Sequence, residues 1–366
     1  MTLELFDRPV YGLNRVEKAE FLLPRLQELT RAHHASCEPY RRILDARGGF
    51  PAQKDPRGGL EQFPFIPVRL FKSHELRSVA SEEVLTVLTS SGTTSQAPSR
   101  IALDRLTAQR QTKALVVIMQ SFLGKSRLPM ALADHAGVVK DRRAHSARAA
   151  GILGFLNFGR DHTYLLDQTM QLERQALLDF ARRHAGNRVF VFGFTFMVWE
   201  YLIRAVERSG LGPVFSGGIL IHGGGWKKLQ DSAVDNETFK SRARAVLGLD
   251  AVHNFYGMVE QVGSIFMECE HGALHAPAFA DVIIRDPKDW SPLGDGSVGV
   301  VQVLSALPGS YPGHSLLTED LGVLLGEDDC PCGRLGKRFR VVGRIPSAEL
   351  RGCSDTHAAT ADERRV

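Results

Sequence analysis

Hydrophobic residues in the first part of the chain repeat at the spacing of an α-helix. Between residues 16 and 46 they recur every three to four positions, for example at Leu22, Leu26 and Leu29. Residues at this spacing share one face of a helix, so we predict two helices over this stretch. The same reasoning predicts a further helix over residues 104–123.

Short runs rich in β-branched and aromatic residues, bounded by glycine or polar residues, follow. The runs are 84–89, 188–193, 218–222 and 251–255. Helical material separates the later runs, and this alternation predicts an α/β fold with a mostly parallel, helix-covered sheet. The prolines within 63–68 exclude a helix there and favour an extended segment. Two more β-rich stretches, 298–304 and 339–342, predict a small β-rich subdomain.

Composition and charge limit the classes of function. The 366 residues are 43% hydrophobic, enough to form the core of a large α/β domain with an appendage. A formal net charge of +4 is too small to indicate a general polyanion binder. The basic residues of segment 140–148 have no interleaved aromatics, so we interpret them as a solvated helix face or a phosphate-facing edge. Nucleic acid is not an expected partner.

The N-terminus has no basic segment followed by an apolar one, and no apolar run approaches the roughly 20 residues of a membrane span. We therefore expect a cytoplasmic protein without a membrane span. The cysteines argue in the same direction, because an odd number in a large chain does not suit a secreted disulfide framework. They are Cys37, Cys269, Cys330, Cys332 and Cys353.

A turn rich in hydroxyl groups follows the run 84–89. It comprises Thr89, Ser90, Ser91, Gly92, Thr93 and Thr94. Glycine permits a positive φ, so successive backbone N–H groups in such a turn can converge on an anion. A simple polar turn fits this segment equally well. It is not a Walker P-loop, because no Gly-Lys-Ser/Thr follows.

Other candidate residues for a nucleotide site lie downstream. Tyr256 and Gly257 precede Glu260 at the end of a predicted strand, where an aromatic ring suits a purine and a carboxylate suits Mg²⁺. Asp320 lies in an acidic turn that suits ribose hydroxyls, and Arg344 offers a cation. A surface turn and a surface arginine are the alternatives. His222 and His314, beside glycines, are interpreted as packing or hydrogen-bonding residues.

These signals occur in one order, Ser-Ser-Gly-Thr-Thr, Tyr-Gly-Met-x-Glu, Thr-Glu-Asp and Gly-Arg. This order resembles that of the adenylate-forming superfamily of acyl- and aryl-CoA ligases. Several longer strings more closely resemble the acyl-protein synthetase of the bacterial luminescence fatty-acid reductase, a short branch of that superfamily. They are 67–73, 150–155, 222–228, 267–271, 311–315 and 351–354. The resemblance extends from about residue 60 to residue 357.

The resemblance implies the adenylate-forming architecture and ATP-dependent activation of a carboxylic acid of the fatty-acid class, with release of pyrophosphate. The acyl group then passes to an enzyme cysteine for delivery to a partner such as an acyl reductase. The implied roles are Thr89 to Thr94 for the triphosphate; Gly223, Gly224 and Gly225 for the adenine pocket; Tyr256, followed by Gly257, for the adenine; Glu260 for Mg²⁺; Asp320 for ribose; Arg344 for the nucleotide; and Cys353 as the acylated thiol.

Two departures from the superfamily pattern affect these expectations. The phosphate turn continues as Ser95-Gln96-Ala97-Pro98 where the superfamily usually has glycine and lysine. Few residues follow Arg344, so we expect the mobile C-terminal domain of the superfamily to be missing. A cysteine arm then replaces CoA as the acyl acceptor. The expected domains are a helical region 1–60, a catalytic domain 61–344 and a tail 345–366 that carries Cys353.

Two short motifs offer metal ligands. Cys269 and His271 are one residue apart, as are Cys330 and Cys332, and together they would form a tetrahedral Cys₃His site for structural zinc. His275 is a replacement candidate for His271. Reduced thiols without a metal are the alternative.

Two other functions remain open. One is an acyl- or aryl-CoA ligase, or a loader of an acyl-carrier protein, that uses the same adenylation site. The other is a non-catalytic nucleotide-binding partner in a reductase complex, motivated by the altered phosphate turn. The sequence leaves open the chain length of the acid, the final acyl acceptor and whether the protein forms homo- or hetero-oligomers.

Overall fold

The computed structural model describes residues 4–49, 59–90, 98–139, 147–226, 233–345. By compactness the chain divides into two units, and the first is made of two separate stretches of sequence. Unit 1 comprises Met1–Ile118 and Tyr256–Glu349, and unit 2 comprises Met119–Phe255 and Leu350–Val366. These units are defined by compactness and do not test the predicted domain limits at residues 60 and 344, which remain predictions. No helix among the described residues is both long and apolar enough to cross a membrane.

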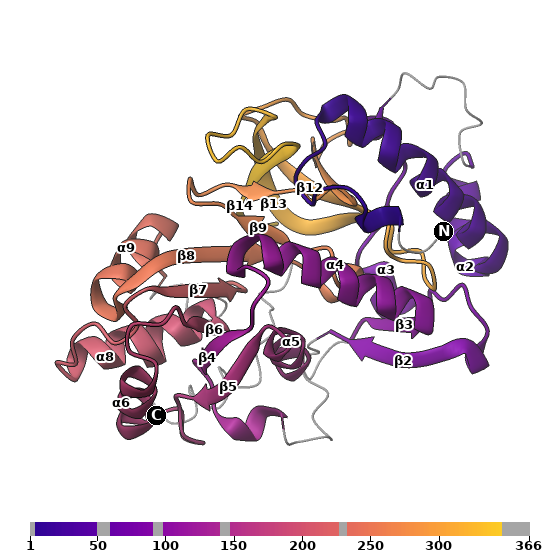
Figure 1. Ribbon diagram of the computed structural model, residues 1–366. Coiled ribbons are helices and arrows are strands. Elements are labelled where there is room, and N and C mark those ends of the chain that lie inside the picture. The colour runs from indigo at the N-terminus through magenta and orange to yellow at the C-terminus, as the bar shows by residue number, and fades with distance from the viewer. Residues whose placement is uncertain (1–3, 50–58, 91–97, 140–146, 227–232, 346–366) are drawn as a thin grey trace, which may run out of the picture. The chain divides into compact units, whose positions relative to one another are not determined.

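Unit 2 contains the predicted parallel sheet (Figure 1). Its strands are β4 (Leu128–Leu132), β5 (Gly159–Tyr164), β6 (Phe190–Phe194), β7 (Gly218–Gly223) and β8 (Leu249–Tyr256). They pair in the order β5-β4-β6-β7-β8, and every pairing is parallel. The helical segments are η5 (Ala136–Val139), α5 (Ala147–Leu156), α6 (Arg174–Arg183), α7 (Thr195–Met197), the π-helical η6 (Val198–Ile203), α8 (Arg204–Arg208) and α9 (Asn236–Leu247).

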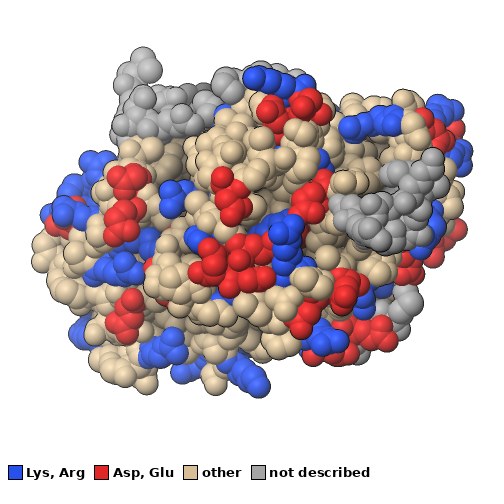
Figure 2. All heavy atoms as spheres, turned by 90° about the horizontal axis from the view of Figure 1, so that it is seen from above, with Lys and Arg blue, Asp and Glu red and all other residues tan. Residues whose placement is uncertain are grey.

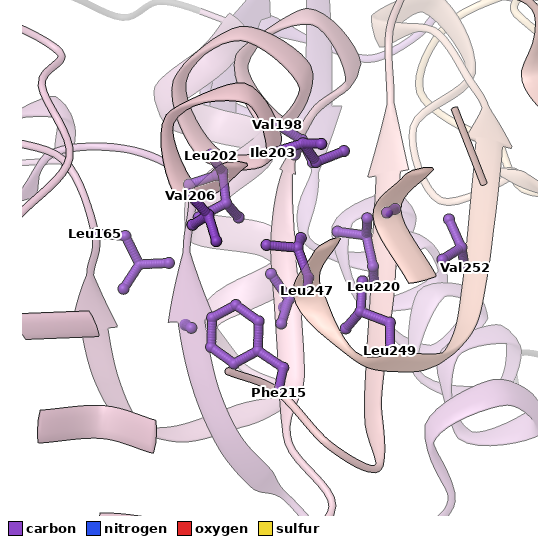
Figure 3. Close-up of a cluster of buried hydrophobic side chains, with 14 of the residues drawn as sticks. Leu165, Val198, Leu202, Ile203, Val206, Phe215, Leu220, Leu247, Leu249 and Val252 are labelled. Atoms are coloured by element: carbon purple, nitrogen blue, oxygen red, sulfur yellow. The ribbon is translucent and has the colours of Figure 1, made fainter. Parts of the chain in front are cut away.

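Both faces of the strands β4, β6 and β7 are buried, which explains why these strands are almost continuously apolar, whereas the edge strand β5 is polar and largely exposed. On one face Val191 and Leu220 join a cluster that includes residues of α6, α8 and α9 (Figure 3). On the other face the ring of Phe192 stacks on Phe155 of α5, with ring centroids 4.2 Å apart. Successive side chains of a strand point to opposite faces, so β6 contributes to both layers. Each buried side chain of this size contributes about 1.5–3 kcal/mol.

Unit 1 contains an antiparallel sheet. Its strands are β9 (Phe266–Glu268), β10 (Leu274–His275), β11 (Ala280–Arg285), β12 (Val298–Ser305), β13 (Ser315–Glu327) and β14 (Lys337–Arg344). They pair in the order β11-β12-β13-β14-β10-β9, and the short β1 (Ile66–Pro67) pairs in parallel with β13. Strands β2 (Val84–Thr89) and β3 (Arg100–Asp104) form a separate antiparallel ribbon.

The α-helices of unit 1 begin with α1 (Arg15–Ser36), α2 (Glu38–Ala46) and α3 (Leu70–Ser73). The unit boundary falls near the end of α4 (Arg105–Leu123). Single turns of 3₁₀-helix are η1 (Glu4–Phe6), η3 (Leu60–Gln62), η4 (Ser81–Glu83) and η8 (Val259–Gln261). Asn14 and Glu17 form a capping box at the start of α1, which satisfies backbone donors that have no partner within the helix.

A buried group of charges fixes α1 to the antiparallel sheet. The Lys18 ammonium lies 3.5 Å from Asp281 of β11 and donates a 3.0 Å hydrogen bond to the carbonyl of Ala276. Lys337 of β14 lies 2.9 Å from the other oxygen of Asp281. All three charged side chains are almost completely buried. Removing one partner from such a group leaves an uncompensated buried charge, so each member depends on the others.

The predicted helices 16–46 and 104–123 are confirmed as α1, α2 and α4, and the predicted strands as β2, β6, β7 and β8. The β-rich stretches 298–304 and 339–342 lie in β12 and β14. The 13-residue strand β13 pairs with both of them. The acidic turn predicted around Asp320 is therefore wrong, because these residues lie within β13.

Candidate nucleotide site and cysteine–histidine cluster

Three predicted nucleotide-site residues of unit 1 lie together around one carboxylate. The hydroxyl of Tyr256 donates a 2.7 Å hydrogen bond to Oδ2 of Asp320. Nε of Arg344 donates a 3.0 Å bond to Oδ1 of the same carboxylate. The register of β13 and β14 places Asp320 opposite Arg344, so strand pairing determines this contact. Burial, followed by the charge of Asp320, raises the pKa of Tyr256, which keeps its phenol protonated as a donor.

The residues beside Asp320 fix the local course of β13. The hydroxyl of the buried Thr318 donates to the carbonyl of Val301 at 2.7 Å and accepts a 3.1 Å bond from the backbone N–H of Asp320. Glu319 forms an ion pair with Arg69, with 2.9 Å between Nη2 and Oε1. Asp320 is therefore held in place by its backbone as well as by its side chain.

The two ends of the hydroxyl-rich turn are joined by hydrogen bonds. Thr89 ends β2, and the backbone N–H of Ser90 donates to the carbonyl of Ser99 at 3.1 Å. In return the N–H of Ser99 donates to the hydroxyl of Ser90 at 2.8 Å. These bonds close the base of the turn. Its remaining predicted site residues, Ser91, Gly92, Thr93 and Thr94, lie outside the described residues, as does Cys353.

Glu260 is a buried acid in the single turn η8, with 8% of its surface exposed. Burial raises the pKa of its carboxyl, while the Ser99 side chain and the Lys72 ammonium favour the ionised form. A buried carboxylate gains from a bound cation, and its hard oxygen atoms suit Mg²⁺. The chemistry of this side chain therefore fits the predicted metal role.

The turn η8 is held by the string 311–315. Nε2 of Gln261 donates to the carbonyl of Gly313 at 2.8 Å and to that of Val303 at 3.1 Å. A Cβ atom at Gly313 would lie 2.7 Å from the Glu260 carbonyl oxygen and 2.2 Å from the Tyr311 ring. Only glycine fits at position 313, so the string 311–315 holds the turn η8 in place by close packing. Gly257 is similarly confined, because its Cβ would lie 2.9 Å from Ile265.

The predicted adenine-pocket glycines belong to unit 2. Gly223 ends β7, and a Cβ atom there would lie 2.4 Å from the ring of Phe255. Gly224 has φ +79°, a conformation that favours glycine, whereas a Cβ at Gly225 would meet no atom within 4 Å. His222 is buried, and its Nδ1 lies 2.9 Å from the Thr195 hydroxyl, which agrees with a packing and hydrogen-bonding role.

Four thiol and imidazole side chains of unit 1 form a compact cluster. Cys269, His275, Cys330 and Cys332 each offer one ligand atom, and these atoms all lie within 4.8 Å of one another. Sγ of Cys269 is 3.9 Å from Sγ of Cys330, and Sγ of Cys332 is 3.5 Å from Nε2 of His275. We refer to these four residues as the cysteine–histidine cluster.

The spacing of the cluster matches a tetrahedral zinc site. Bonds of about 2.3 Å to sulfur and about 2.0–2.1 Å to nitrogen give tetrahedron edges of about 3.8 Å between sulfurs and about 3.6 Å between sulfur and nitrogen. Burial lowers the pKa of His275 to about 4, so its imidazole is neutral and available as a ligand. Burial also raises the pKa of Cys330 to about 12, and a metal ion would offset the cost of its thiolate.

The fourth ligand of the cluster differs from the first sequence-based choice. His271 is exposed, in the turn where the N–H of Gly272 donates to the carbonyl of Cys269 at 3.1 Å. His275 lies after that turn on β10, which pairs back along β9, and it is fully buried beside the cysteines. The replacement candidate His275, and not His271, is therefore the histidine of this cluster.

Sequence reasoning did not assign Arg69, Lys72 or Glu319 to the site. The sequence did contain a signal for two of them, because Arg69 and Lys72 belong to the string 67–73 that carried the family resemblance.

On the face shown in Figure 2, acidic and basic side chains are interspersed. This face gives no support to a polyanion-binding surface, in agreement with the small net charge.

Comparison with known proteins identifies relatives over most of the chain. The family model described as "Acyl-protein synthetase, LuxE" matches residues 8–360. The long-chain-fatty-acid–luciferin-component ligase of Vibrio harveyi is 26% identical over 333 residues, which cover 88% of this chain and 83% of the relative. The protein of the same name from Aliivibrio fischeri is 24% identical over 302 residues, which cover 81% and 78%, respectively.

A solved structure confirms the fold class. An open conformation of 2-hydroxyisobutyryl-CoA ligase, in complex with 2-HIB-AMP and CoA, superposes with a TM-score of 0.72 and 18% sequence identity. The match covers 93% of this chain and 77% of the ligase. The chain thus has the adenylate-forming ligase fold that the order of its motifs predicted.

Proposed function

The chain belongs to the LuxE family of acyl-protein synthetases, and from this membership we propose that it activates a long-chain fatty acid with ATP and transfers the acyl group to its own Cys353. The relatives named above are long-chain-fatty-acid ligases, which supports the choice of acid. The observation that carries the proposal is the Asp320 carboxylate held between Tyr256 and Arg344, because a fixed acceptor of this kind suits ribose hydroxyls.

The proposed reaction has two steps. In the first, an oxygen of the fatty-acid carboxylate attacks the α-phosphorus of ATP, the bond to the β-phosphate breaks, and pyrophosphate leaves. In the second, the thiolate of Cys353 attacks the acyl carbon of the adenylate, a thioester forms, and AMP leaves. The first step needs no general base, because the carboxylate is already ionised, so the work of the protein there is positioning and stabilisation of charge. In the second step the thiol of Cys353 loses its proton to solvent before it attacks.

Glu260 is the proposed ligand of Mg²⁺, which, when bound, neutralises charge on the departing pyrophosphate. Asp320 orients the ribose, and Arg344 both orients Asp320 and supplies positive charge near the nucleotide. Tyr256 holds the second oxygen of Asp320. Gly223, Gly224 and Gly225 remain the proposed adenine-pocket residues, and Thr89 to Thr94 the proposed triphosphate-binding residues.

The test compares acyl acceptors. The protein is incubated with ATP, Mg²⁺ and a panel of fatty acids, with and without CoA, and the products are followed by intact-protein mass spectrometry and peptide mapping. We expect an acid-dependent thioester on Cys353 that forms without CoA and is removed by hydroxylamine. Acyl-CoA as the sole product would instead support a CoA ligase, and absence of acid-dependent ATP–pyrophosphate exchange would support a non-catalytic nucleotide-binding protein.

We propose an acyl reductase as the partner that takes the acyl group from the thioester, and a cytoplasmic location for the reaction. Family membership supports the first of these. Mixing the acylated protein with a candidate reductase and NADPH tests the transfer, because the thioester should disappear as aldehyde forms.

We also propose that the cysteine–histidine cluster binds one structural zinc ion. The support is its tetrahedral spacing and the neutral His275. With all four positions filled by protein ligands, no position is left open for a substrate, so the role is structural. Elemental analysis of protein purified without chelator should give about one zinc per chain. Clearly substoichiometric zinc, together with rapid alkylation of Cys330 and Cys332, would contradict the proposal.

A further inference from the structure

Two matching turns of unit 1 carry the sulfurs of the cysteine–histidine cluster. Cys269 begins the turn between β9 and β10, and Cys330 and Cys332 lie in the turn between β13 and β14. The N–H of Gly272 donates to the Cys269 carbonyl at 3.1 Å, and that of Gly333 donates to the Cys330 carbonyl at 3.0 Å. Both glycines have φ +77°, so the two turns share one backbone form. The turns meet through their first cysteines, whose Sγ atoms are 3.9 Å apart.

The N-terminal segment contacts both of these hairpins. The N–H of Ala278, three residues after His275, donates to the carbonyl of Val10 at 2.7 Å. The N–H of Leu335, just before β14, donates to the carbonyl of Tyr11 at 3.0 Å. The ring of Tyr11 also packs edge-on against His275, with ring centroids 6.1 Å apart. A link between the two turns therefore stabilises the surface that binds the N-terminal segment.

The three sulfurs differ in their access to solvent. Cys269 is fully buried and Cys330 is buried with 9% of its surface exposed, whereas Cys332 is partly exposed. All three sulfur atoms lie within 4.8 Å of one another. A small oxidant from solvent therefore meets Cys332 first, and the other two sulfurs are close to the one that it oxidises. An accessible cysteine beside resolving cysteines is the arrangement of a redox-sensitive site.

We propose that the cysteine–histidine cluster is an oxidation site, where a peroxide reacts at Cys332 and the final product is a disulfide between Cys269 and Cys330. This inference goes beyond the proposed function, and it rests on the positions of the sulfurs, with or without the proposed zinc ion. The buried pair is the lasting product, because a disulfide without solvent access is shielded from attacking thiols. The new bond joins the two turns covalently and takes over the link that the ion makes when it is bound.

With hydrogen peroxide as the oxidant, the reaction has three balanced steps. First, the thiolate of Cys332 attacks a peroxide oxygen, the O–O bond breaks, hydroxide leaves, and a sulfenic acid forms on Cys332. Second, the thiolate of Cys330 attacks that sulfur, the S–O bond breaks, hydroxide leaves, and a disulfide forms between Cys330 and Cys332. Third, the thiolate of Cys269 attacks the sulfur of Cys330, and the Cys332 thiolate leaves. The two sulfurs of the final disulfide lose two electrons in total, and the peroxide gains them.

The test maps the oxidised thiols directly. Full-length Cys353→Ser protein, in which the proposed acyl thiol takes no part, is treated with hydrogen peroxide, its free thiols are alkylated after denaturation, and its peptides are mapped by mass spectrometry. We expect a linked pair of peptides that contain Cys269 and Cys330, about 2 Da lighter than their reduced sum, with Cys332 free. Dithiothreitol should reverse the change. A further Cys37→Ala substitution is the matched control, since Cys37 is a buried thiol outside the cluster, and it should leave the rate unchanged.

Two further variants test the order of the steps. A further Cys332→Ser substitution should slow formation of the disulfide about tenfold or more, because the remaining two sulfurs are buried. A further Cys269→Ser substitution should stop the reaction at the disulfide between Cys330 and Cys332. Oxidation of the Cys332→Ser variant at the parent's rate would overturn the role of Cys332.

The peptide map of the parent protein needs no cluster variant and is decisive by itself. A sulfinic acid on Cys332, or a lasting disulfide between Cys330 and Cys332 while Cys269 is intact, would overturn the proposal. A chromophoric chelator in the same reaction reports zinc, and about one ion should be released for each disulfide formed. A disulfide between Cys269 and Cys330 without zinc release would contradict the zinc site alone. Acid-dependent ATP–pyrophosphate exchange of the reduced protein tests the proposed function separately.

Discussion

The hydroxyl of Tyr256 and the carboxylate of Asp320 are 2.7 Å apart, although 64 residues of sequence separate them. Tyr256 is the last residue of β8, and Asp320 lies within β13. Since Arg344 binds the other oxygen, Asp320 has little freedom to rotate, and its lone pairs face a fixed direction.

Asp320→Ala should raise the apparent KM for ATP about tenfold or more, because hydrogen bonds from ribose hydroxyls to a charged acceptor are lost. Tyr256→Phe should raise this KM only a few-fold. The substitution removes one hydrogen bond that orients Asp320, worth about 1 kcal/mol, and leaves the acceptor carboxylate in place. Steady-state pyrophosphate release at varied ATP measures both effects. Asp295→Ala, at an exposed position of the same unit, is the control and should match the wild type.

Glu260→Gln should slow adenylation and raise the Mg²⁺ concentration that gives half-maximal rate, because an amide oxygen binds Mg²⁺ more weakly than a carboxylate. The same variant should be more stable than the wild type at neutral pH. The folded-state pKa of Glu260 is raised by burial, so the stability it contributes is complete below its unfolded pKa and is lost as the pH rises through the folded value. Thermal melts at pH 4 and pH 7 should show the gain only at pH 7.

His275→Asn should abolish zinc binding and lower the melting temperature, whereas His271→Asn should retain about one zinc per chain. The two variants make the same chemical change four residues apart, but only His275 lies in the cysteine–histidine cluster. Chelation of the wild type should lower its melting temperature more than it slows residual turnover, because the site is closed. Zinc loss from His271→Asn with full zinc in His275→Asn would reverse the assignment.

Acid should destabilise the protein through a buried histidine pair. His33 and His314 stack with ring centroids 5.1 Å apart. Their other neighbours include Thr30, Tyr40, Phe63, Ser78 and the Pro308 carbonyl. Burial lowers the pKa of His33 to about 4 and that of His314 well below its usual value. A depressed histidine pKa means that the folded state excludes a proton which the unfolded chain binds. The contribution of the neutral pair to the free energy of unfolding is therefore fully present above pH 6.5 and is lost as the pH falls toward 4. For His33 this loss amounts to up to about 3 kcal/mol.

Denaturant titrations of His33→Gln between pH 7.5 and pH 4.5 measure this loss. The variant should show a shallower pH slope than the wild type, whatever its absolute stability. His74→Gln, at an exposed position, should retain the wild-type slope. Equal slopes for all three proteins would show that the pair does not control acid stability.

Cys353→Ser should retain acid-dependent pyrophosphate release and lose hydroxylamine-sensitive acyl labelling, because adenylation precedes the attack of the thiol. Cys37→Ala removes a buried thiol at the end of α1 and should leave labelling unchanged. Undiminished labelling of Cys353→Ser would exclude this residue as the acceptor.

Local patterns in the sequence predicted the helices α1, α2 and α4 and the parallel strands β6, β7 and β8, because burial leaves a clear hydrophobic pattern, but they did not predict β4 or β5. The order of the motifs identified Tyr256, Asp320 and Arg344, and the structure brings them together. The choice between His271 and His275 could not be made in this way. It depends on where the β9–β10 turn ends, and a shift of a few residues exchanges an exposed position for a buried one.

Other features had no signal that a single sequence can provide. Lys18 lies in a helix, where lysine is usually solvated, and its burial depends on Asp281 and Lys337 from distant strands. Such contacts arise from tertiary structure, whereas periodicity reports only which face of an element is covered.

One consequence of the buried charges of Lys18, Asp281 and Lys337 concerns the order in which segments of the chain can fold during synthesis. Lys18 is synthesised 258 residues before Ala276, whose carbonyl receives its ammonium. Until β11 and β14 have emerged, burying Lys18 would leave its charge uncompensated, so α1 keeps that face in water. We therefore expect α1 to dock only after β11 and β14 have been synthesised, so that a chain stalled before residue 337 would leave α1 exposed to chaperones and proteases.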